Sequence, residues 1–238
     1  MSTARQLKIV ENLRKRSYQP RRKSGNLSSE AVNGLAAFAI PVCYAKGAAL
    51  FVEGQPSRGI IILYSGRVKL FTSSADGRIF ILRFADRGEI LGLAGTLSGQ
   101  PYEVWAEAIE PTETGFVERR DLVDVMRRCG EVAVQVAMQL SESYCSAIAG
   151  VRVMGLSLSA SQKLAIFLLN WCESNHSFHN EAVATFHLTH EEISQVIGTS
   201  RETVSRLLSE FKKKGLVEWT GDSLILTDRA ALESSAAN

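Results

Sequence analysis

A chain of 238 residues is long enough for one large domain or two modest domains, each with its own core. The net charge of +2 is too small to argue for nucleic-acid binding by itself, so any basic surface must be local. No apolar run has the length of a membrane span, and the polar, basic start lacks the apolar segment of a secretory signal peptide. We therefore expect a cytoplasmic protein without a membrane partner.

The cysteines are too widely spaced to suggest a disulfide framework, which suits a reducing compartment. They are Cys43, Cys129, Cys145 and Cys172. The spacing of Cys172, His176 and His179 could serve a metal ion, but a polar loop is the simpler interpretation. We predict no metal site and no cofactor.

The first part of the chain, residues 1–33, is interpreted as a basic tail. Residues 1–24 contain eight lysines or arginines and one acidic residue, with no interleaved aromatic pattern. A basic arm that lies near DNA is the alternative.

Short strand-like runs predominate in residues 34–128. Many short strands at close spacing predict a double-sheet β-roll or jelly roll. Ser65 and Gly66 separate two apolar runs and predict a two-residue hairpin, and Asp76 with Gly77 predicts a turn before the next run.

A long amphipathic helix is predicted for residues 129–157. Its apolar positions advance by three or four residues, which makes one continuous stripe. These positions are Val132, Val136, Leu140, Tyr144, Ala147, Val151 and Met154. Such a stripe could pack on the β-roll of the same chain or form a coiled-coil-like seam with a second copy.

The most informative stretch is residues 189–215, which predicts a helix-turn-helix. Thr189 and Glu192 have the spacing of a capping box at the start of the first helix. Gly198 suits the left-handed position that ends a helix, and Ser200 or the threonine before it can cap the second helix.

The second helix has two faces of different character. A buried stripe is predicted at Val204, Leu207, Leu208 and Phe211. The polar face holds Arg201, Glu202, Ser205, Arg206 and Ser209. Arginine can donate two hydrogen bonds to guanine and glutamate can accept one from cytosine, so this face could recognise bases in the major groove. A solvated helix with an ordinary Glu202–Arg206 ion pair is the alternative.

Two strand-like runs, 216–219 and 224–227, follow around a turn. A helix-turn-helix followed by a two-stranded hairpin predicts a winged helix. The lysines at 212–214 precede the hairpin, where they could contact phosphates or simply solvate the end of the helix.

The run SRETVSR at 200–206, after EISQVIG at 192–198, resembles the recognition motif of the cyclic-AMP receptor protein/FNR superfamily of bacterial transcription regulators. The resemblance extends over roughly residues 35–232. It implies an α+β fold with an N-terminal double-stranded β-roll, a long dimerisation helix at 129–157, and a C-terminal winged helix-turn-helix domain at 158–238.

The resemblance also implies roles for individual residues. The dimer seam would include Val136, Leu140, Ala147 and Val151. Base contacts would come from Arg201, Glu202, Ser205 and Arg206. Phosphate contacts would come from Thr189, His190, Ser200, Thr203 and Lys212.

The effector site of the family is altered in this sequence. Members that bind cyclic nucleotides hold the phosphate with a Gly-Glu pair and an Arg-Ser/Thr pair, because a buried anion needs cationic and N–H donors. Here Leu93 follows Gly92, and Tyr102 and Glu103 stand at the positions of the second pair. We expect no response to cyclic nucleotide. The iron–sulfur branch needs an N-terminal cysteine cluster, and no cysteine precedes Cys43.

The sequence thus predicts a homodimeric regulator that binds near-palindromic double-stranded DNA with TGTGA-like half-sites, with RNA polymerase as a further candidate partner. Ser205 also matches the FNR branch and leaves a TTGAT-like half-site open. A β-roll that binds an unidentified small molecule is the alternative function. No catalytic triad, P-loop or two-cysteine metal motif indicates an enzyme.

Overall fold

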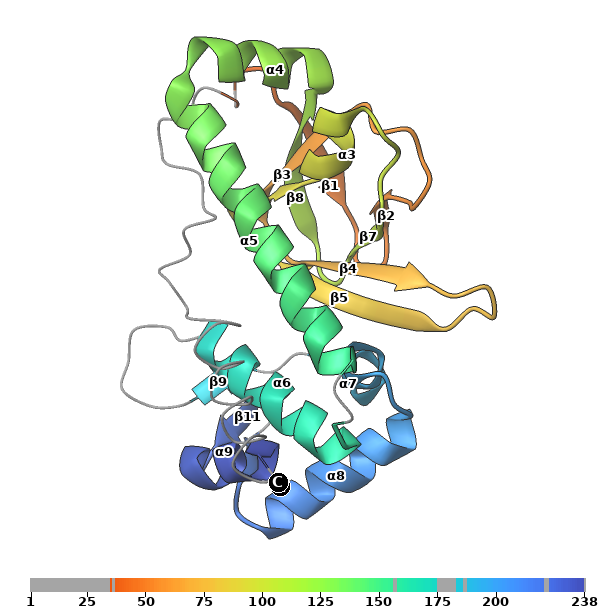
Figure 1. Cartoon of the computed structure of the whole chain (residues 1–238), viewed down its shortest axis with the longest axis vertical. Coiled ribbons are helices and arrows are strands. Elements are labelled where there is room, and N and C mark those ends of the chain that lie inside the picture. The colour runs from red at the N-terminus through yellow and green to blue at the C-terminus, as the bar shows by residue number, and fades with distance from the viewer. Residues whose placement is uncertain are drawn as a thin grey trace. The chain divides into compact units, whose positions relative to one another are not determined.

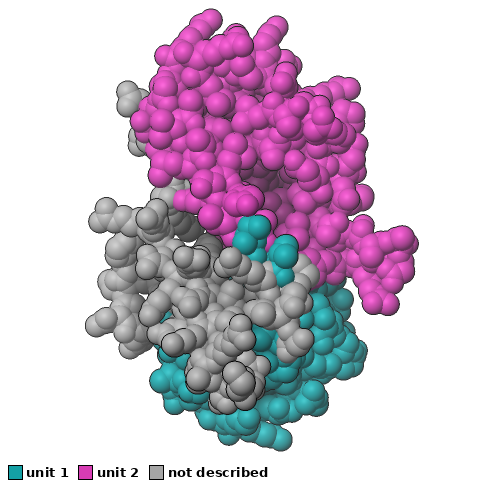
Figure 2. Space-filling view, viewed as in Figure 1, with its two compact units in different colours: residues 1–21, 148–238 teal, residues 22–147 magenta. Residues whose placement is uncertain are grey.

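The structure is a computed structural model that describes residues 35, 37–155, 158–174, 183–185, 188–220 and 223–237 (Figure 1). The chain divides into two compact units that meet in sequence between Ala147 and Ile148 (Figure 2). The predicted basic tail, residues 1–33, lies outside the described residues.

The unit that ends at Ala147, magenta in Figure 2, is a β-roll made of two antiparallel four-stranded sheets. The strands are β1 (Ile40–Tyr44), β2 (Ala49–Phe51), β3 (Gly59–Ser65), β4 (Val68–Ser73), β5 (Ile79–Ala85), β6 (Ile90–Leu91), β7 (Trp105–Ala108) and β8 (Thr112–Glu118). One sheet has the order β1-β8-β3-β6 and the other β2-β7-β4-β5. This arrangement confirms the predicted double-sheet β-roll.

The two predicted glycine turns have different outcomes. Asp76 and Gly77 join β4 to β5, which pair directly as antiparallel neighbours. Ser65 and Gly66 join β3 to β4, which lie in different sheets, so the hairpin predicted there is wrong. Gly66 has a φ of 84°, and a Cβ at this position would collide with Thr112. The glycine therefore lets the chain cross between the sheets, where turn chemistry alone suggested pairing.

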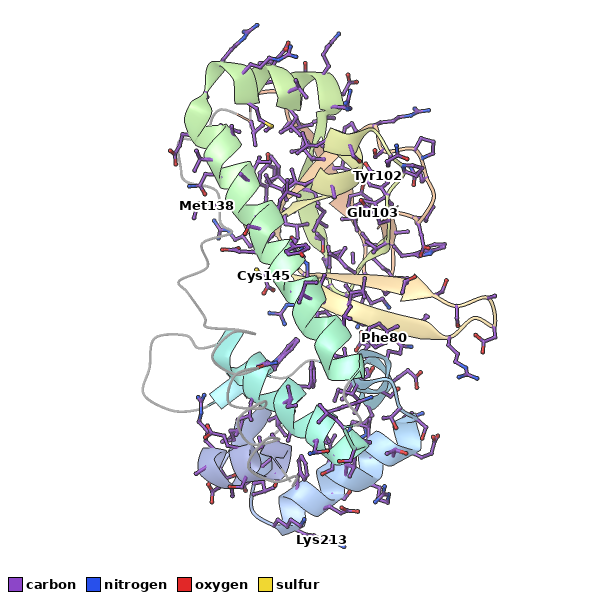
Figure 3. The ribbon with its side chains drawn as sticks, viewed as in Figure 1. Phe80, Tyr102, Glu103, Met138, Cys145 and Lys213 are labelled. Atoms are coloured by element: carbon purple, nitrogen blue, oxygen red, sulfur yellow. The ribbon has the colours of Figure 1, made fainter. Side chains whose placement is uncertain are left out.

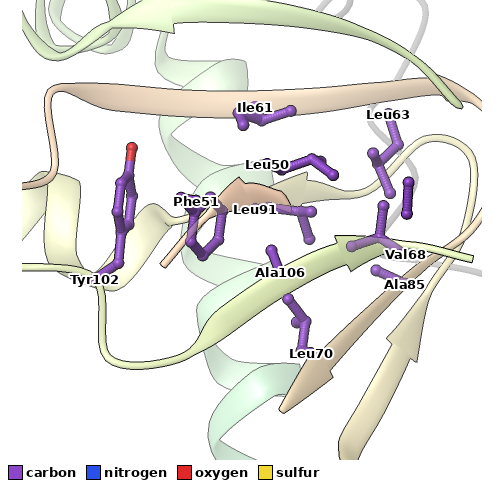
Figure 4. Packing of buried hydrophobic residues seen from close by; sticks show 11 residues of the cluster. Leu50, Phe51, Ile61, Leu63, Val68, Leu70, Ala85, Leu91, Tyr102 and Ala106 are labelled. Atoms are coloured by element: carbon purple, nitrogen blue, oxygen red, sulfur yellow. The ribbon is translucent and has the colours of Figure 1, made fainter. Parts of the chain in front are cut away.

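Strand β3 is buried on both faces, which explains its uninterrupted apolar run. Because side chains alternate along a strand, Ile61 and Leu63 enter the core that includes residues of both sheets (Figure 4). Ile60 and Ile62 enter a second core, which the sheet shares with helices α3 (Leu93–Ser98), α4 (Arg119–Arg128) and α5 (Gly130–Gly155).

Helix α5 covers nearly the whole length predicted for the long helix, but the first part of its apolar stripe is buried within its own unit. Val132 and Val136 are 0% and 1% exposed and belong to the second core of their own unit. Leu140 packs against the same core and is partly buried. The assignment of Val136 to a dimer seam is therefore corrected, because its own β-roll already covers this side chain.

A buried glutamine fixes α5 against the edge of the first sheet. Gln139 is 4% exposed, and its Oε1 accepts a hydrogen bond from the backbone N of Ile90 at 3.1 Å. Its Nε2 donates to the backbone O of the same residue. Strand β6 lies at the end of its sheet, so the side-chain amide satisfies backbone groups that would otherwise be buried without a partner.

The unit that includes residues 148–238, teal in Figure 2, contains a winged helix-turn-helix domain. Its elements are α6 (Ala160–Ser174), β9 (Val183–Thr185), α7 (His190–Ile197), α8 (Arg201–Lys213), β10 (Val217–Thr220), β11 (Ser223–Leu226) and α9 (Arg229–Ala237). The predicted hairpin is formed by β10 and β11. Strand β9, which pairs with β11, and helix α9 were not predicted. Within the described ranges, no helix combines the length and hydrophobicity needed to cross a lipid bilayer.

From the two hydrogen bonds between Gln139 and the backbone of Ile90 we predict a specific loss of stability. Gln139→Leu preserves the volume of the side chain but leaves both polar groups of Ile90 unpaired, so the free energy of unfolding should fall by about 2 to 4 kcal/mol. Gln135→Leu is the matched control, since the amide of Gln135 bonds only the exposed carboxylate of Glu131 one turn earlier. Its effect should stay within about 0.5 kcal/mol. Urea unfolding of both variants would measure the difference, and equal losses would contradict the assigned role.

Candidate nucleic-acid interface

The first helix of the motif, α7, begins with the predicted capping box. Thr189 Oγ1 accepts a hydrogen bond from the backbone N of Glu192 at 3.2 Å. In return, Glu192 Oε2 accepts from the backbone N of Thr189 at 2.8 Å. The helix ends at Gly198, whose φ of 68° is left-handed. The cap and the glycine together set where α7 starts and stops.

The second helix, α8, is capped by Ser200, one of the two residues considered for this role. Ser200 Oγ accepts from the backbone N of Thr203 at 3.2 Å. The predicted stripe is buried at every position, with exposed fractions of 4% or less at Val204, Leu207, Leu208 and Phe211. Burial of this stripe turns the polar face of α8 to the surface.

The predicted base-reading side chains share that surface. Arg201, Glu202 and Arg206 are exposed, and Ser205 between them is half-buried. A hydrogen bond from its own backbone N–H, assisted by the Ser200 side chain and the charge of Arg201, lowers the pKa of the Glu202 carboxyl. Glu202 is therefore an anion near neutral pH and can accept a hydrogen bond from cytosine N4.

Arg206 has an ionic partner that differs from the expected one. Its Nη1 donates to Glu210 Oε1 at 2.7 Å, one turn further along α8, and not to Glu202. The side chains are 64% and 43% exposed. Exposed pairs of this spacing contribute only about 0.3–0.5 kcal/mol, so Arg206 can exchange this partner for a base at little cost. The i,i+4 spacing could have indicated Glu210.

A side-chain contact joins the two helices of the motif, α7 and α8. His190, the first residue of α7, lies with its Nδ1 2.8 Å from Ser205 Oγ on α8. The structure thus brings together one predicted phosphate contact and one predicted base contact. Sequence reasoning did not find this pair, because the residues are 15 positions apart and no local pattern connects them.

The other candidate phosphate contacts fall into two groups. Thr189, Ser200 and Thr203 lie at the starts of the two helices, where they also take part in the caps. Lys212 lies in the last turn of α8 with Lys213 (Figure 3), and both side chains are exposed. Their place in the motif is compatible with phosphate contact, which stays a prediction.

The altered effector cassette in the β-roll is filled by one of its own side chains. Tyr102 is 5% exposed and stacks on Phe51, with ring centroids 4.1 Å apart (Figure 4). Its hydroxyl donates to the backbone O of Gly59 at 2.6 Å. Gly92 leaves room for the ring, because a Cβ there would lie 2.6 Å from Tyr102 Cε1. Burial raises the pKa of Tyr102, so the hydroxyl keeps the proton that it donates.

The rest of the cassette is held by similar internal bonds. Thr96 Oγ1 also donates to the backbone O of Gly59, at 2.7 Å. Arg119 Nε donates to the backbone O of Thr96 at 2.6 Å, a role that sequence reasoning missed. Leu93 is buried in the second core, and Glu103 is exposed. The cassette therefore directs an aromatic ring and a leucine inward, while its carboxylate faces outward.

Neither metal-ligating clusters nor disulfides are found among the described side chains. Within the described ranges, no group of three or more His, Cys, Asp or Glu side chains is arranged to hold a metal ion. Cys43 and Cys145 are exposed free thiols, and Cys129 is a partly buried one. The side chains of Cys172, His176 and His179 lie outside the described part of the chain.

Comparison with known proteins places both units in one family. The model of the cyclic nucleotide-binding domain matches residues 41–129, and that of the Crp-like helix-turn-helix domain matches residues 162–235. The cyclic AMP receptor protein of Thermus thermophilus is 27% identical over 193 residues, which cover 81% of this chain and 86% of that protein. The transcriptional activator protein FnrA of Stutzerimonas stutzeri is 29% identical over 194 residues, covering 79% and 76%.

The fold is also similar to that of a solved structure. The solved structure of FixK2 from Bradyrhizobium japonicum superposes with a TM-score of 0.73 at 24% identity, covering 82% of this chain and 96% of that one. The chain belongs to the CRP/FNR superfamily of bacterial transcription regulators. It is a transcription regulator with a helix-turn-helix DNA-binding domain.

Proposed function

We propose that this regulator acts as a homodimer that reads near-palindromic DNA through α8, without a cyclic-nucleotide signal and without an iron–sulfur cluster. The observation that carries the proposal is the polar face of α8. It presents Arg201, Glu202 and Arg206 opposite a fully buried stripe, on a helix with a defined start. RNA polymerase is the further partner that regulation of transcription implies.

The arginines of this face support a guanine-containing half-site. Arg201 and Arg206 lie in the first two turns of α8, where a recognition helix meets base edges. An arginine at each position favours a guanine through two parallel hydrogen bonds, which supports a TGTGA-like half-site. In a two-fold symmetric dimer, the two copies of α8 would bind half-sites about one turn of the DNA helix apart.

Selection from randomised DNA tests this assignment. Arg201→Ala should cost about 1–3 kcal/mol on the preferred site and relax the preference at one guanine. Lys212→Ala is the control, because loss of a phosphate contact should weaken all sequences about equally. Half-sites that lack a guanine at the position altered by Arg201→Ala would refute base reading by this side chain. A TTGAT-like consensus would instead favour the FNR-type reading through Ser205.

The outward face of α5 supports the dimer. Val134 and Met138 are 54% and 40% exposed, and Cys145 is an exposed residue of the same helix (Figure 3). Ile148 follows at 37% exposed. These positions advance by four, seven and three residues, the spacing of a coiled-coil seam. We therefore move the proposed seam from Val136 to this face. The predicted Val151 is exposed and flanks it, whereas the predicted Ala147, although exposed, points to a different side of the helix because it is two residues from Cys145.

Cys145 offers a direct test of the seam. In a parallel, in-register pair of helices, equivalent seam positions face each other, so mild oxidation of the intact protein should produce a disulfide-linked dimer. Cys145→Ser should abolish the cross-link, whereas Cys43→Ser, which removes the exposed thiol of β1, should not. Met138→Lys should weaken dimerisation in sedimentation experiments, since it buries an unpaired charge. A monomeric wild-type protein at micromolar concentration would contradict the dimer.

The proposed indifference to cyclic nucleotide rests on Tyr102. A buried phosphate needs a cation or several N–H donors, whereas here a tyrosine ring occupies the cassette and the neighbouring Glu103 is an acid. The hydroxyl of Tyr102 is already committed to Gly59. A nucleotide would have to displace the stacked ring from Phe51 before it could enter.

Titration calorimetry with cyclic AMP and cyclic GMP should therefore detect no binding at micromolar concentrations. DNA affinity, measured on the selected site, should be the same with and without either nucleotide. The same preparation must bind its selected DNA, which shows that the protein is folded and active. Micromolar nucleotide binding accompanied by a gain in DNA affinity would disprove the proposal.

A further inference from the structure

We infer that His190 determines the base preference at the position read by Ser205, because it controls the direction of the serine hydroxyl. The inference rests on the proposed function, in which the polar face of α8 reads bases. It concerns a residue that contacts Ser205 from another helix and acts as a positioning residue.

The hydroxyl of Ser205 behaves differently from those of other helical serines in the same unit. Serines within helices commonly bond the backbone O three or four residues earlier. This pattern is found for Ser194, Ser209, Ser234 and Ser235. Ser205 Oγ instead lies 2.8 Å from His190 Nδ1 on α7. Its orientation is therefore set by the neighbouring helix and not by its own backbone.

This orientation matters because of where Ser205 lies. It is three residues after Glu202 and directly before Arg206, on the polar face of α8. Its own backbone O accepts from Ser209 Oγ at 2.8 Å. The imidazole is half-buried at the start of α7, directly after the N-cap residue Thr189. The contact thus connects a rigid element of the motif to the centre of the reading face.

The hydrogen bond between His190 and Ser205 determines whether the serine can donate or only accept toward DNA. A serine hydroxyl has one hydrogen, while an imidazole Nδ1 either carries a hydrogen or accepts one. If Nδ1 accepts, Ser205 donates its hydrogen to His190 and offers DNA only lone pairs. These can accept a hydrogen bond from the amino group of adenine N6 or cytosine N4. If Nδ1 donates, the hydrogen of Ser205 is directed to the keto oxygen that replaces this amino group in the other two bases, guanine O6 or thymine O4. In either case His190 commits the serine to one class of base.

Without His190, the hydroxyl can rotate and serve both classes. His190→Ala should therefore reduce the discrimination between adenine or cytosine and guanine or thymine at one position by roughly three- to tenfold, the worth of one hydrogen bond. His190→Asn places a polar atom near the site of Nδ1 and should retain the discrimination. His190→Gln reaches instead toward the site of Nε2 and should lose it.

A double-mutant cycle on selected DNA tests the inference. Binding of the four single-base variants at the affected position is measured for wild type, His190→Ala, Ser205→Ala and the double variant. If His190 acts through Ser205, His190→Ala should not change base preference further in the Ser205→Ala background. Thermal unfolding of each variant separates specificity from loss of fold.

The outcomes distinguish the inference from the proposed function. Equal weakening of all four variants by His190→Ala would overturn the inference, because His190 would then act only through phosphate or through stability. An unchanged preference in Ser205→Ala would overturn it as well, while the arginine-dependent preferences stand. A wild-type protein that selects no DNA sequence would contradict the proposed function itself.

Discussion

The packing of α5 against its own β-roll is the contact on which the proposed assembly of this regulator depends. Val132 and Val136 lie in a core of the β-roll unit, and one turn later the amide of Gln139 pairs with the backbone of Ile90. These contacts allow only one rotation of the helix about its axis, because any other would expose two valines and leave the backbone groups of β6 unpaired. The face that remains outward carries Met138 and Cys145, so the same contacts that hold α5 also select the surface proposed for dimerisation.

The same strand leads directly into the altered cassette. Strand β6 ends at Leu91, and the residues that follow, Gly92 and Leu93, begin α3. There the backbone O of Gly59 accepts hydrogen bonds from both Tyr102 and Thr96. Internal side chains therefore satisfy the polar groups of a region that, in nucleotide-binding relatives, we expect a ligand to satisfy. A cassette that is complete without a ligand has no evident means of coupling nucleotide to α5, and this physical reason supports the proposed indifference to cyclic nucleotide.

The reading face of α8 combines side chains of different rigidity. Arg201 and Arg206 are long and exposed, and the ion pair of Arg206 with Glu210 is weak enough to exchange. Ser205 is short, half-buried and held by His190. Long cations suit strong contacts that tolerate small displacements, whereas a held hydroxyl adds discrimination only if its direction is defined. The inferred role of His190 follows from this difference.

Local spacing was sufficient for much of the fold. The sequence by itself determined the capping box of α7, the left-handed Gly198 and the buried stripe of α8, because each depends on residues within one or two helical turns. It also restricted the cap of α8 to two adjacent residues, of which the structure uses Ser200. Periodicity also determined the many short strands of the β-roll and the length of α5. The family motif identified the polar face of α8 as the candidate site.

Only the tertiary structure decided which distant segments meet. It separated β3 from β4 although a turn joins them, and it assigned Val136 to a core instead of a seam. The pairing of His190 with Ser205 and that of Gln139 with Ile90 likewise came from the fold. A turn signal is the same whether its flanking strands pair or cross between sheets, and a helical stripe shows which residues are apolar but not what covers them. Partners so far apart in the chain are set by the packing of whole elements, which local sequence patterns do not contain.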